Sequence, residues 1–254
     1  GEPTQGAGAV AMVVSDSPRL LGIDARTIGD YTRQVMDFWR PLYSKYAIAD
    51  GHYSIECYLD ALTGAREVAL ESVGEVYDSL IACLYHVPFV KMAKKAHHRE
   101  LECVLKRSLD LKSSDDQALF NESFERLASP WLELNADVGN IYTGSLYLSL
   151  MDLLRQGDAT HANQRLSLFS YGSGCGATYC LGTVAQTAHQ YAKKIDPQSM
   201  LNERRRLDIE SYEELILANE QASSQASLNP TDYGISQGLS YVGTIDHQRR
   251  YVFV

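Results

Sequence analysis

The segment "VYDSLIACLYHVPFVKMAKKAHHRELECVLKR", residues 76–107, predicts a buried strand that runs directly into an amphipathic helix. Its first part, 76–87, is an apolar run of the kind found in strands covered on both faces. Pro88 fits the first turn of the following helix, because the N–H that proline lacks would have no intrahelical partner there. We therefore expect one strand-to-helix unit of an α/β fold.

The rest of the chain predicts further strands and helices around this unit. Residues 9–14, "AVAMVV", are expected to form a buried strand, whereas 26–53 is aromatic and irregular and is expected to be an ordered loop. Segment 165–184 carries a Gly-Ser-Gly turn between two apolar runs, which predicts a hairpin. Helices are expected over 54–72, after the polar residues 113–116, after a turn at 139–140 and over 211–222, and two closing strands over 238–254 around Asp246-His247. This order predicts the α/β class, with a mixed sheet covered by helices.

Composition limits the possible functions. The chain has 254 residues, of which 45% are hydrophobic and 22% charged, as in globular proteins with a sizeable core. A net charge of −9 argues against general binding of nucleic acid, since phosphate binding needs a concentrated positive surface. We find neither an apolar stretch of about 18 residues nor a secretory leader, so we expect no membrane span and a cytoplasmic location.

The cysteines and the first residues add two expectations. Five cysteines with no CxxC pair argue against a disulfide framework and against a structural metal. The opening "GEPTQGAGAVAMVVSDSP" runs from a glycine-rich turn straight into an apolar segment and lacks an initiator methionine. We therefore expect that a further N-terminal part precedes this chain.

His86 lies where the predicted strand ends and the helix begins. Ligands of α/β sheets gather at the carboxyl ends of strands, and a histidine there can donate to a carbonyl oxygen or transfer a proton near neutral pH. The alternative, a structural histidine packed in a turn, is equally consistent with the pattern. Cys83 lies at an odd offset along the strand, which places the two side chains on opposite faces and argues against a Cys/His dyad.

Basic residues follow on the predicted helix. Lys91 and Lys95 are four residues apart, so they share a face and could hold a phosphate or pyrophosphate. A solvated basic face is the alternative that the spacing alone favours. His97 and His98 are adjacent and cannot point the same way on a helix, so we expect surface residues rather than a metal site.

Two turns contribute polar candidates. "GNIYTG" places Asn140, Tyr142 and Thr143 before a helix, where an amide can cap the helix or hold a ligand carbonyl, and capping is the interpretation that this fragment favours. "FSYGSG" brings Ser173 and backbone N–H groups to a turn that either approaches a substrate or is simply tight. Cys175 follows that turn without a basic neighbour in sequence that would activate a thiol.

Several segments together resemble the 3-hydroxy-3-methylglutaryl-CoA synthase family, in the same order and at compatible separations. They are "PTQGAGAVAMVV", "DFWRP", "YAIADGHYSIECYLDAL", "YHVPFVKMAKKA", "VGNIYTGSLYLSL" and "LFSYGSG". The family has the thiolase fold, which consists of two similar halves. The resemblance implies that residues 1–20 end the N-terminal half and that residues 21–254 form the C-terminal half.

The resemblance also implies an acyltransferase activity. The family joins an acetyl group, carried on an active-site cysteine, to the β-keto carbon of an acetoacetyl thioester. His86 matches the histidine that hydrogen-bonds the acceptor oxygens, and Asn140 the asparagine that holds the acceptor thioester. Ser173 and Tyr142 fall in the matching substrate-binding segments, and Lys91 and Lys95 match lysines that meet the phosphates of the pantetheine carrier. No separate cofactor or metal is implied, because acetyl and acceptor arrive on the phosphopantetheine of an acyl carrier protein or of CoA.

The chain departs from the family pattern in one respect. The nucleophilic cysteine and the catalytic glutamate of the family belong to the first half, and no cysteine here lies in a corresponding segment. We therefore expect these residues in an N-terminal half, on the same chain or on a second polypeptide, and a homodimer as in other thiolase-fold proteins. Without that half the two-step mechanism has no first step.

Some features are more similar to the polyketide branch of the family, which adds a β-branch to an acceptor on an acyl carrier protein. These are "ADGHYSIECYLDAL", the cysteine directly after YGSG, and the "DHQRRY" ending. Two alternatives remain: a mevalonate-pathway synthase that acts on acetyl-CoA and acetoacetyl-CoA, and a non-catalytic fragment that binds carrier proteins.

Overall fold

The computed structural model describes residues 4–44, 46–222, 238–245 and 248–254. Backbone contacts divide the chain into two compact units, Gly1–Ile195 and Asp196–Val254, and each is described by itself. Among the helices that the structure describes, none combines the length and the apolar character that crossing a lipid bilayer demands.

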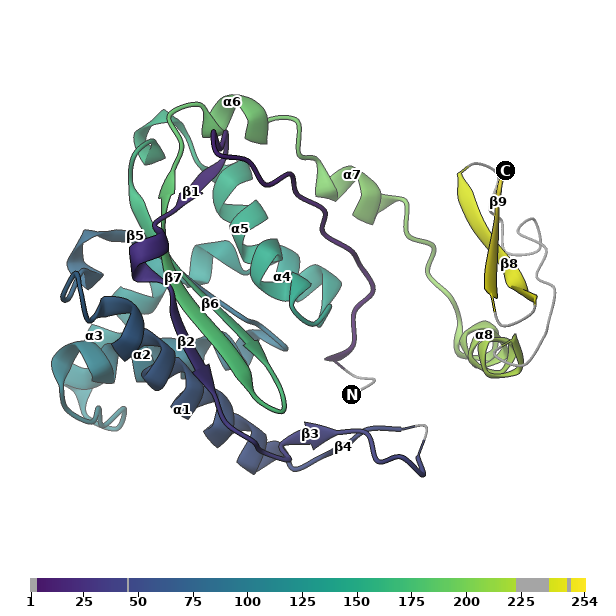
Figure 1. The fold of residues 1–254 in the computed structure, drawn as a ribbon, viewed down its shortest axis with the longest axis horizontal. Coiled ribbons are helices and arrows are strands. Elements are labelled where there is room, and N and C mark those ends of the chain that lie inside the picture. The colour runs from purple at the N-terminus through teal and green to yellow at the C-terminus, as the bar shows by residue number, and fades with distance from the viewer. Residues whose placement is uncertain (1–3, 45, 223–237, 246–247) are drawn as a thin grey trace. The chain divides into compact units, whose positions relative to one another are not determined.

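A mixed sheet forms the centre of the first unit (Figure 1). Its strands follow the order β1-β7-β6-β5, and β2 also pairs with β7. Strands β5 and β6 are parallel, with Tyr85 opposite Phe169, whereas the other pairs are antiparallel. The strands are β1 Leu21–Ile23, β2 Gly29–Thr32, β5 Leu80–Tyr85, β6 Arg165–Gly172 and β7 Gly176–Val184. The α/β class and the mixed sheet are thus confirmed.

Helices cover both faces of this sheet (Figure 1). One apolar core lies between the sheet and the first three helices, and a second lies between the sheet and α5 and α6. The helices are α1 Gly51–Leu70, α2 Val90–Leu105, α3 Ser114–Leu127, α4 Glu133–Val138, α5 Gly144–Gln156 and α6 Ala188–Ala192. Short 3₁₀ turns occur at Ala25–Thr27, Tyr77–Ser79, Ser129–Trp131 and Ala159–His161. Because both faces are covered, β5 is apolar along its whole length, as its sequence predicts.

The strand-to-helix unit over 76–107 is confirmed, with shorter elements than predicted. The first residues of the apolar run form the turn Tyr77–Ser79, and the strand ends at Tyr85. Helix α2 begins at Val90 with Phe89 as its N-cap, so Pro88 precedes the helix instead of lying in its first turn. The predicted hairpin over 165–184 is confirmed as β6 and β7.

Two predictions near the N-terminus are wrong. Residues 9–14 form no strand, and the Val13 and Val14 side chains are 96% and 88% exposed. An apolar run becomes a strand only where another strand satisfies its backbone N–H and C=O groups. In the described part of the chain, no strand lies beside residues 9–14. Segment 26–53 is not simply a loop, because it contains β2 and a small ladder of β3, Phe38–Trp39, with β4, Ile48–Ala49.

Strand β2 depends on a glycine. A Cβ on Gly29 would lie 2.1 Å from the Ala65 carbonyl oxygen and 2.3 Å from the Ala69 nitrogen, both in α1. Only glycine therefore allows the strand to approach the helix backbone this closely. The sequence "GDYT" lacks an alternating apolar pattern, which is why the prediction missed it.

In its described residues, 196–222, 238–245 and 248–254, the second unit contains two helices and a hairpin. Helices α7, Pro197–Asn202, and α8, Ile209–Ala222, precede strands β8, Leu239–Ile245, and β9, Gln248–Phe253. The predicted helix over 211–222 and the two closing strands are confirmed. The predicted turn at Asp246-His247 lies outside the described residues.

Candidate functional site

His86 follows the last residue of β5 at the carboxyl edge of the sheet. Its backbone N–H donates to the Phe169 carbonyl at 2.7 Å, and its own carbonyl accepts from the Tyr58 hydroxyl at 2.8 Å. The imidazole centroid lies 6.3 Å from the ring centroids of both Tyr58 and Tyr171. Strand β6 and helix α1 thus fix the backbone of His86, while two tyrosine rings lie beside its side chain.

The His86 side chain is buried, neutral and without a partner. It is 7% exposed, and this burial lowers its pKa to about 4, so the imidazole is uncharged at pH 7. Its Nδ1 is fully buried and makes no hydrogen bond to the described residues, nor does Nε2. Because Nδ1 is the enclosed nitrogen, Nε2 is the one that a ligand can reach. A neutral imidazole carries one N–H donor, which suits a carbonyl oxygen.

Ser173 lies in the turn between β6 and β7, beyond the same edge of the sheet. Parallel pairing of β5 with β6 brings the carboxyl ends of both strands to this edge. Buried Asp37 holds the turn, because its Oδ1 accepts from the Gly174 N–H at 2.9 Å and its Oδ2 from the Tyr171 hydroxyl at 2.7 Å. The Ser173 side chain is exposed.

Asn140 and Tyr142 lie in the turn that precedes α5. Asn140 Oδ1 accepts from the Tyr142 N–H at 2.9 Å, which closes the turn, and its Nδ2 makes no hydrogen bond to the described residues. The backbone of Asn140 pairs with Thr4 and Gly6. Tyr142 has a left-handed backbone, with φ of +57°, and an exposed ring. No hydrogen bond or ring contact joins these two residues to His86 in the described part of the chain, so their shared site stays a prediction.

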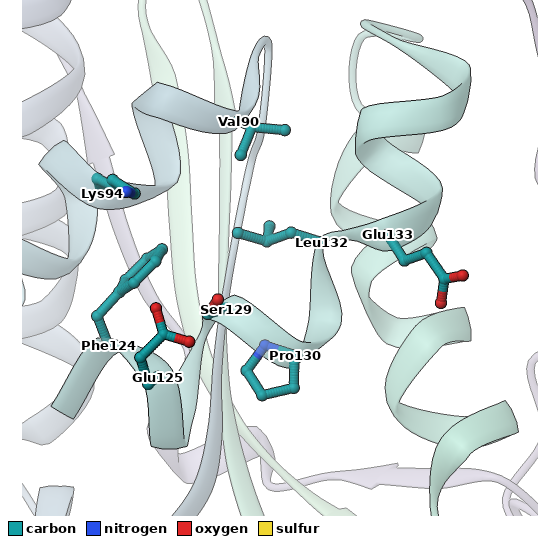
Figure 2. A pocket seen from close by; sticks show the side chains of 8 residues that line it. All are labelled: Val90, Lys94, Phe124, Glu125, Ser129, Pro130, Leu132 and Glu133. Atoms are coloured by element: carbon teal, nitrogen blue, oxygen red, sulfur yellow. The ribbon is translucent and has the colours of Figure 1, made fainter. Parts of the chain in front are cut away.

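Lys91 and Lys95 lie on the first turns of α2, both exposed and without an ion pair among the residues described. The intervening Lys94 is different, because its ammonium group lies 5.6 Å from the centroid of the Phe124 ring. Lys94 also borders a surface groove of about 390 Å³ (Figure 2). That groove is lined by Val90, Lys94, Phe124, Glu125, Ser129, Pro130, Leu132 and Glu133, so none of the predicted site residues lies in it.

The prediction of a surface position for His97 is wrong. Its side chain is fully buried, with ring nitrogens bonded to hydroxyls of Tyr77, Tyr85 and Ser123, while the His98 side chain is 26% exposed. Helical spacing explains the difference, because residue 97 lies one turn after buried Ala93 on the face of α2 that packs on the core. Among the described residues, no group of three or more metal-ligating side chains gathers.

All five thiols are free, and four of them are unsuited to nucleophilic attack. Burial raises the pKa of Cys83 to about 12 and that of Cys180 to about 11, and it also raises the pKa of Cys103 and Cys175. A raised pKa leaves little thiolate at pH 7. These four residues therefore lack the activation that a nucleophilic cysteine needs.

Asp37, Tyr58 and Tyr171 support the site, and sequence reasoning did not single them out. Asp37 lies in "DFWRP" and Tyr171 in "FSYGSG", both among the resemblance motifs. Nothing in either motif indicates that the two side chains meet across 134 positions. The presence of a polar residue in each motif was the only sequence signal for this contact.

A family model and curated relatives match this chain. The model described as "Hydroxymethylglutaryl-coenzyme A synthase C terminal" matches residues 21–103 and 102–253. A hydroxymethylglutaryl-CoA synthase from Enterococcus faecalis is 33% identical over 213 residues, which cover 84% of this chain and 52% of that protein. The polyketide biosynthesis 3-hydroxy-3-methylglutaryl-ACP synthase PksG of Bacillus subtilis is 32% identical over 214 residues, covering 84% and 49%.

Solved structures of the same kind are similar in fold. MvaS in complex with 3-hydroxy-3-methylglutaryl coenzyme A has a TM-score of 0.83 and 37% identity, covering 99% of this chain and 62% of that one. The curacin pathway HMG synthase in complex with apo donor-ACP has a TM-score of 0.87 and 29% identity, covering 100% and 63%. The chain thus spans about half the length of the curated relatives named above. It belongs to the hydroxymethylglutaryl-CoA synthase family, and its helix-covered mixed sheet is part of that family's thiolase-like fold.

Proposed function

We propose that this chain supplies the acceptor site of an acyltransferase that joins an acetyl group to the β-keto carbon of a β-ketoacyl thioester. One observation carries the proposal: a neutral, unpartnered imidazole, that of His86, lies at the carboxyl edge of the sheet. Membership of the family supports the same reaction class.

In the proposed step, the methyl carbon of the acetyl thioester loses a proton to the glutamate of the first half and attacks the β-keto carbon. A carbon–carbon bond forms, and the electron pair of the ketone π bond moves onto its oxygen, which takes up a proton. Water then hydrolyses the thioester that links the condensed product to the cysteine, which releases the product as a carboxylic acid and restores the thiol. His86 Nε2–H donates to the keto oxygen and stabilises the charge that develops there.

The other predicted residues bind the acceptor in this proposal. Ser173 and Asn140 hold the thioester end, with Tyr142 beside it, and Lys91 and Lys95 meet the phosphate of the carrier. The free exposed ammonium groups on α2 support the last assignment. We place the nucleophilic cysteine and the glutamate outside residues 1–254, because none of the five cysteines lies in a segment that corresponds to the family's nucleophile. The raised pKa of Cys83, Cys103, Cys175 and Cys180 supports this placement. A homodimer of the complete assembly is part of the same proposal.

We favour an acceptor on an acyl carrier protein, in polyketide β-branching. Lys91 and Lys95, both exposed on the first turns of α2, form a local basic face on a chain of net charge −9, which suits an acidic carrier. The relatives named for carrier-bound substrates support this choice. The second candidate is an acetoacetyl-CoA acceptor, which the 37% identity to MvaS supports.

Two measurements on the intact protein test the proposal. Intact mass before and after incubation with an acetyl-loaded carrier or acetyl-CoA should reveal one acetyl group gained on a thiol outside residues 1–254. Absence of any acetylated thiol would instead support a non-catalytic binding fragment. Rates with carrier-bound and CoA-bound acetoacetyl acceptors then separate the two candidates, because carrier specificity predicts at least a tenfold preference for the carrier, about 1.4 kcal/mol.

A further inference from the structure

A second buried histidine, His97, ties together three elements behind the strand that leads to His86. Its Nδ1 lies 3.0 Å from the hydroxyl of Tyr85, the last residue of β5. Its Nε2 lies 2.7 Å from Ser123 Oγ on α3 and 3.2 Å from the hydroxyl of Tyr77. Both ring nitrogens of an α2 residue are therefore engaged by hydroxyl groups of other elements.

The surroundings hold the His97 ring in one orientation. Its centroid lies 6.0 Å from that of Phe120 and 5.6 Å from that of Phe124, both at steep interplanar angles. Burial, Arg126 and His98 lower the pKa of His97 to about 3, so the ring is neutral. A neutral imidazole has one donor and one acceptor, and here each faces a hydroxyl that can take the complementary role. The ring is a fixed, fully satisfied bridge.

The bridge reaches His86 through a single peptide bond. Tyr85 is fully buried and precedes His86 directly. The His86 ring has no hydrogen bond to the described residues, so among direct contacts only packing orients the ring. Its position therefore depends on its backbone, which Phe169 and Tyr58 hold on either side, and on the anchored residue before it.

A polar bridge is not needed for stability alone. Apolar side chains of similar volume fill a core at least as favourably, whereas buried hydroxyls and an imidazole cost free energy unless each finds a partner. What a satisfied network adds is direction and a unique arrangement. Given the function proposed above, we propose that His97 is a positioning residue for the acceptor-side histidine, acting through Tyr85 to hold His86.

Two matched variants of the intact protein test this proposal. Tyr85→Phe and Tyr77→Phe each remove one buried hydroxyl that contacts the same imidazole, and each keeps its aromatic ring. Of these two tyrosines, only Tyr85 is joined to His86 by a peptide bond. Three quantities are measured: the melting temperature, the titration of His86 by NMR with labelled imidazole carbons, and the separate rates of acetyl transfer and condensation.

Tyr85→Phe should melt about 2–4 °C below the unmodified protein, because it loses one buried hydrogen bond. Tyr77→Phe should melt at least as far below it, because the Tyr77 hydroxyl contacts Ser123 Oγ as well as His97. Tyr85→Phe should lower the condensation rate about tenfold without changing the rate of acetyl transfer, since small displacements of a reacting group are costly. The His86 titration midpoint should rise from about 4 toward the ordinary 6.5 as the ring gains access to water. Tyr77→Phe should change the condensation rate by no more than about twofold and should leave the His86 titration midpoint in place.

Equal losses of condensation in the two variants, or an unmoved His86 titration in Tyr85→Phe, would overturn the proposal. So would an unchanged condensation rate in Tyr85→Phe. If the unmodified protein catalyses no condensation, the proposed function fails, and the NMR comparison still decides whether His97 controls His86. If Tyr85→Phe does not fold, His97→Gln replaces it, because glutamine keeps one donor and one acceptor. His97→Gln should lower the condensation rate and raise the His86 titration midpoint, each by less than is expected for Tyr85→Phe.

Discussion

The Tyr171 hydroxyl donates to Asp37 Oδ2 at 2.7 Å, and the second oxygen of Asp37 accepts from the Gly174 N–H at 2.9 Å. One buried carboxylate thus secures both the end of β6 and the turn that carries Ser173. Burial and Asp37 together raise the pKa of Tyr171, which keeps the hydroxyl protonated as the donor. The geometry of the turn therefore depends on a residue from the distant "DFWRP" segment.

Replacing Asp37 should loosen this turn. Asp37→Ala leaves the Tyr171 hydroxyl and the Gly174 N–H without partners, which should lower the free energy of unfolding by about 2–4 kcal/mol. Tyr171→Phe removes one of the two bonds and should cost about half as much. Urea denaturation of both variants measures the difference, and an Asp37→Ala protein as stable as the unmodified one would contradict the role of the carboxylate.

Acid should destabilise the fold through His86. Its folded-state pKa of about 4 lies below the ordinary 6.5, so between these values the unfolded chain binds a proton that the folded chain does not. The stability due to neutral burial is complete above pH 6.5 and falls as the pH drops, by about 2 kcal/mol at pH 5. His86→Gln should reduce the loss of unfolding free energy between pH 7 and pH 5 by about that amount. An identical pH profile in the variant would be inconsistent with the buried neutral imidazole.

Lys91 and Lys95 should act on substrate binding rather than on chemistry. Changing both to alanine should raise KM about tenfold for a phosphate-bearing carrier with kcat unchanged, and added salt should shrink the difference. Lys94→Ala is the matched control on the same helix, because Lys94 lies against Phe124 at the groove in Figure 2. Equal effects of Lys94→Ala and of the double variant would argue for a diffuse basic surface instead of a phosphate contact.

Gly29 should not tolerate a side chain. A methyl group there meets backbone atoms of Ala65 and Ala69, which cannot move aside, so Gly29→Ala should cost about 2–3 kcal/mol of stability. Gly51→Ala is the comparison, since nothing lies within 4 Å of the position that its methyl group would take at the start of α1. Thermal unfolding should separate the two, and similar melting temperatures would mean that β2 does not approach α1 as described.

Local patterns predicted local structure. The strand and helix over 76–107 and the hairpin over 165–184 were predictable because hydrophobic spacing and turn residues lie within each segment. Strand β2 was not, because its four residues become a strand only by pairing with β7, as in Gly29 with Tyr179. The strand predicted over 9–14 was wrong because this segment has the apolar pattern of a strand but no strand partner in the described part of the chain.

The candidate site, too, has features that could be predicted from local sequence and features that could not. His86 could be singled out because the end of one strand and the start of one helix are contiguous in sequence. The contact between Asp37 and Tyr171 could not, because it joins segments that only the folded sheet brings together. The spacing of Ala93 and Leu101 on the same helix indicates that His97 is buried, whereas the adjacent His98 lies off that face.

The central claim is that His86 serves the condensation step of a synthase. Its most direct test is a single-turnover comparison of the intact protein with its His86→Gln variant, following acetyl transfer to the enzyme and product formation separately. We predict acetyl transfer within about twofold of normal and condensation slower by about 10²- to 10³-fold. Equal loss of both steps, or condensation at the normal rate, would contradict the claim.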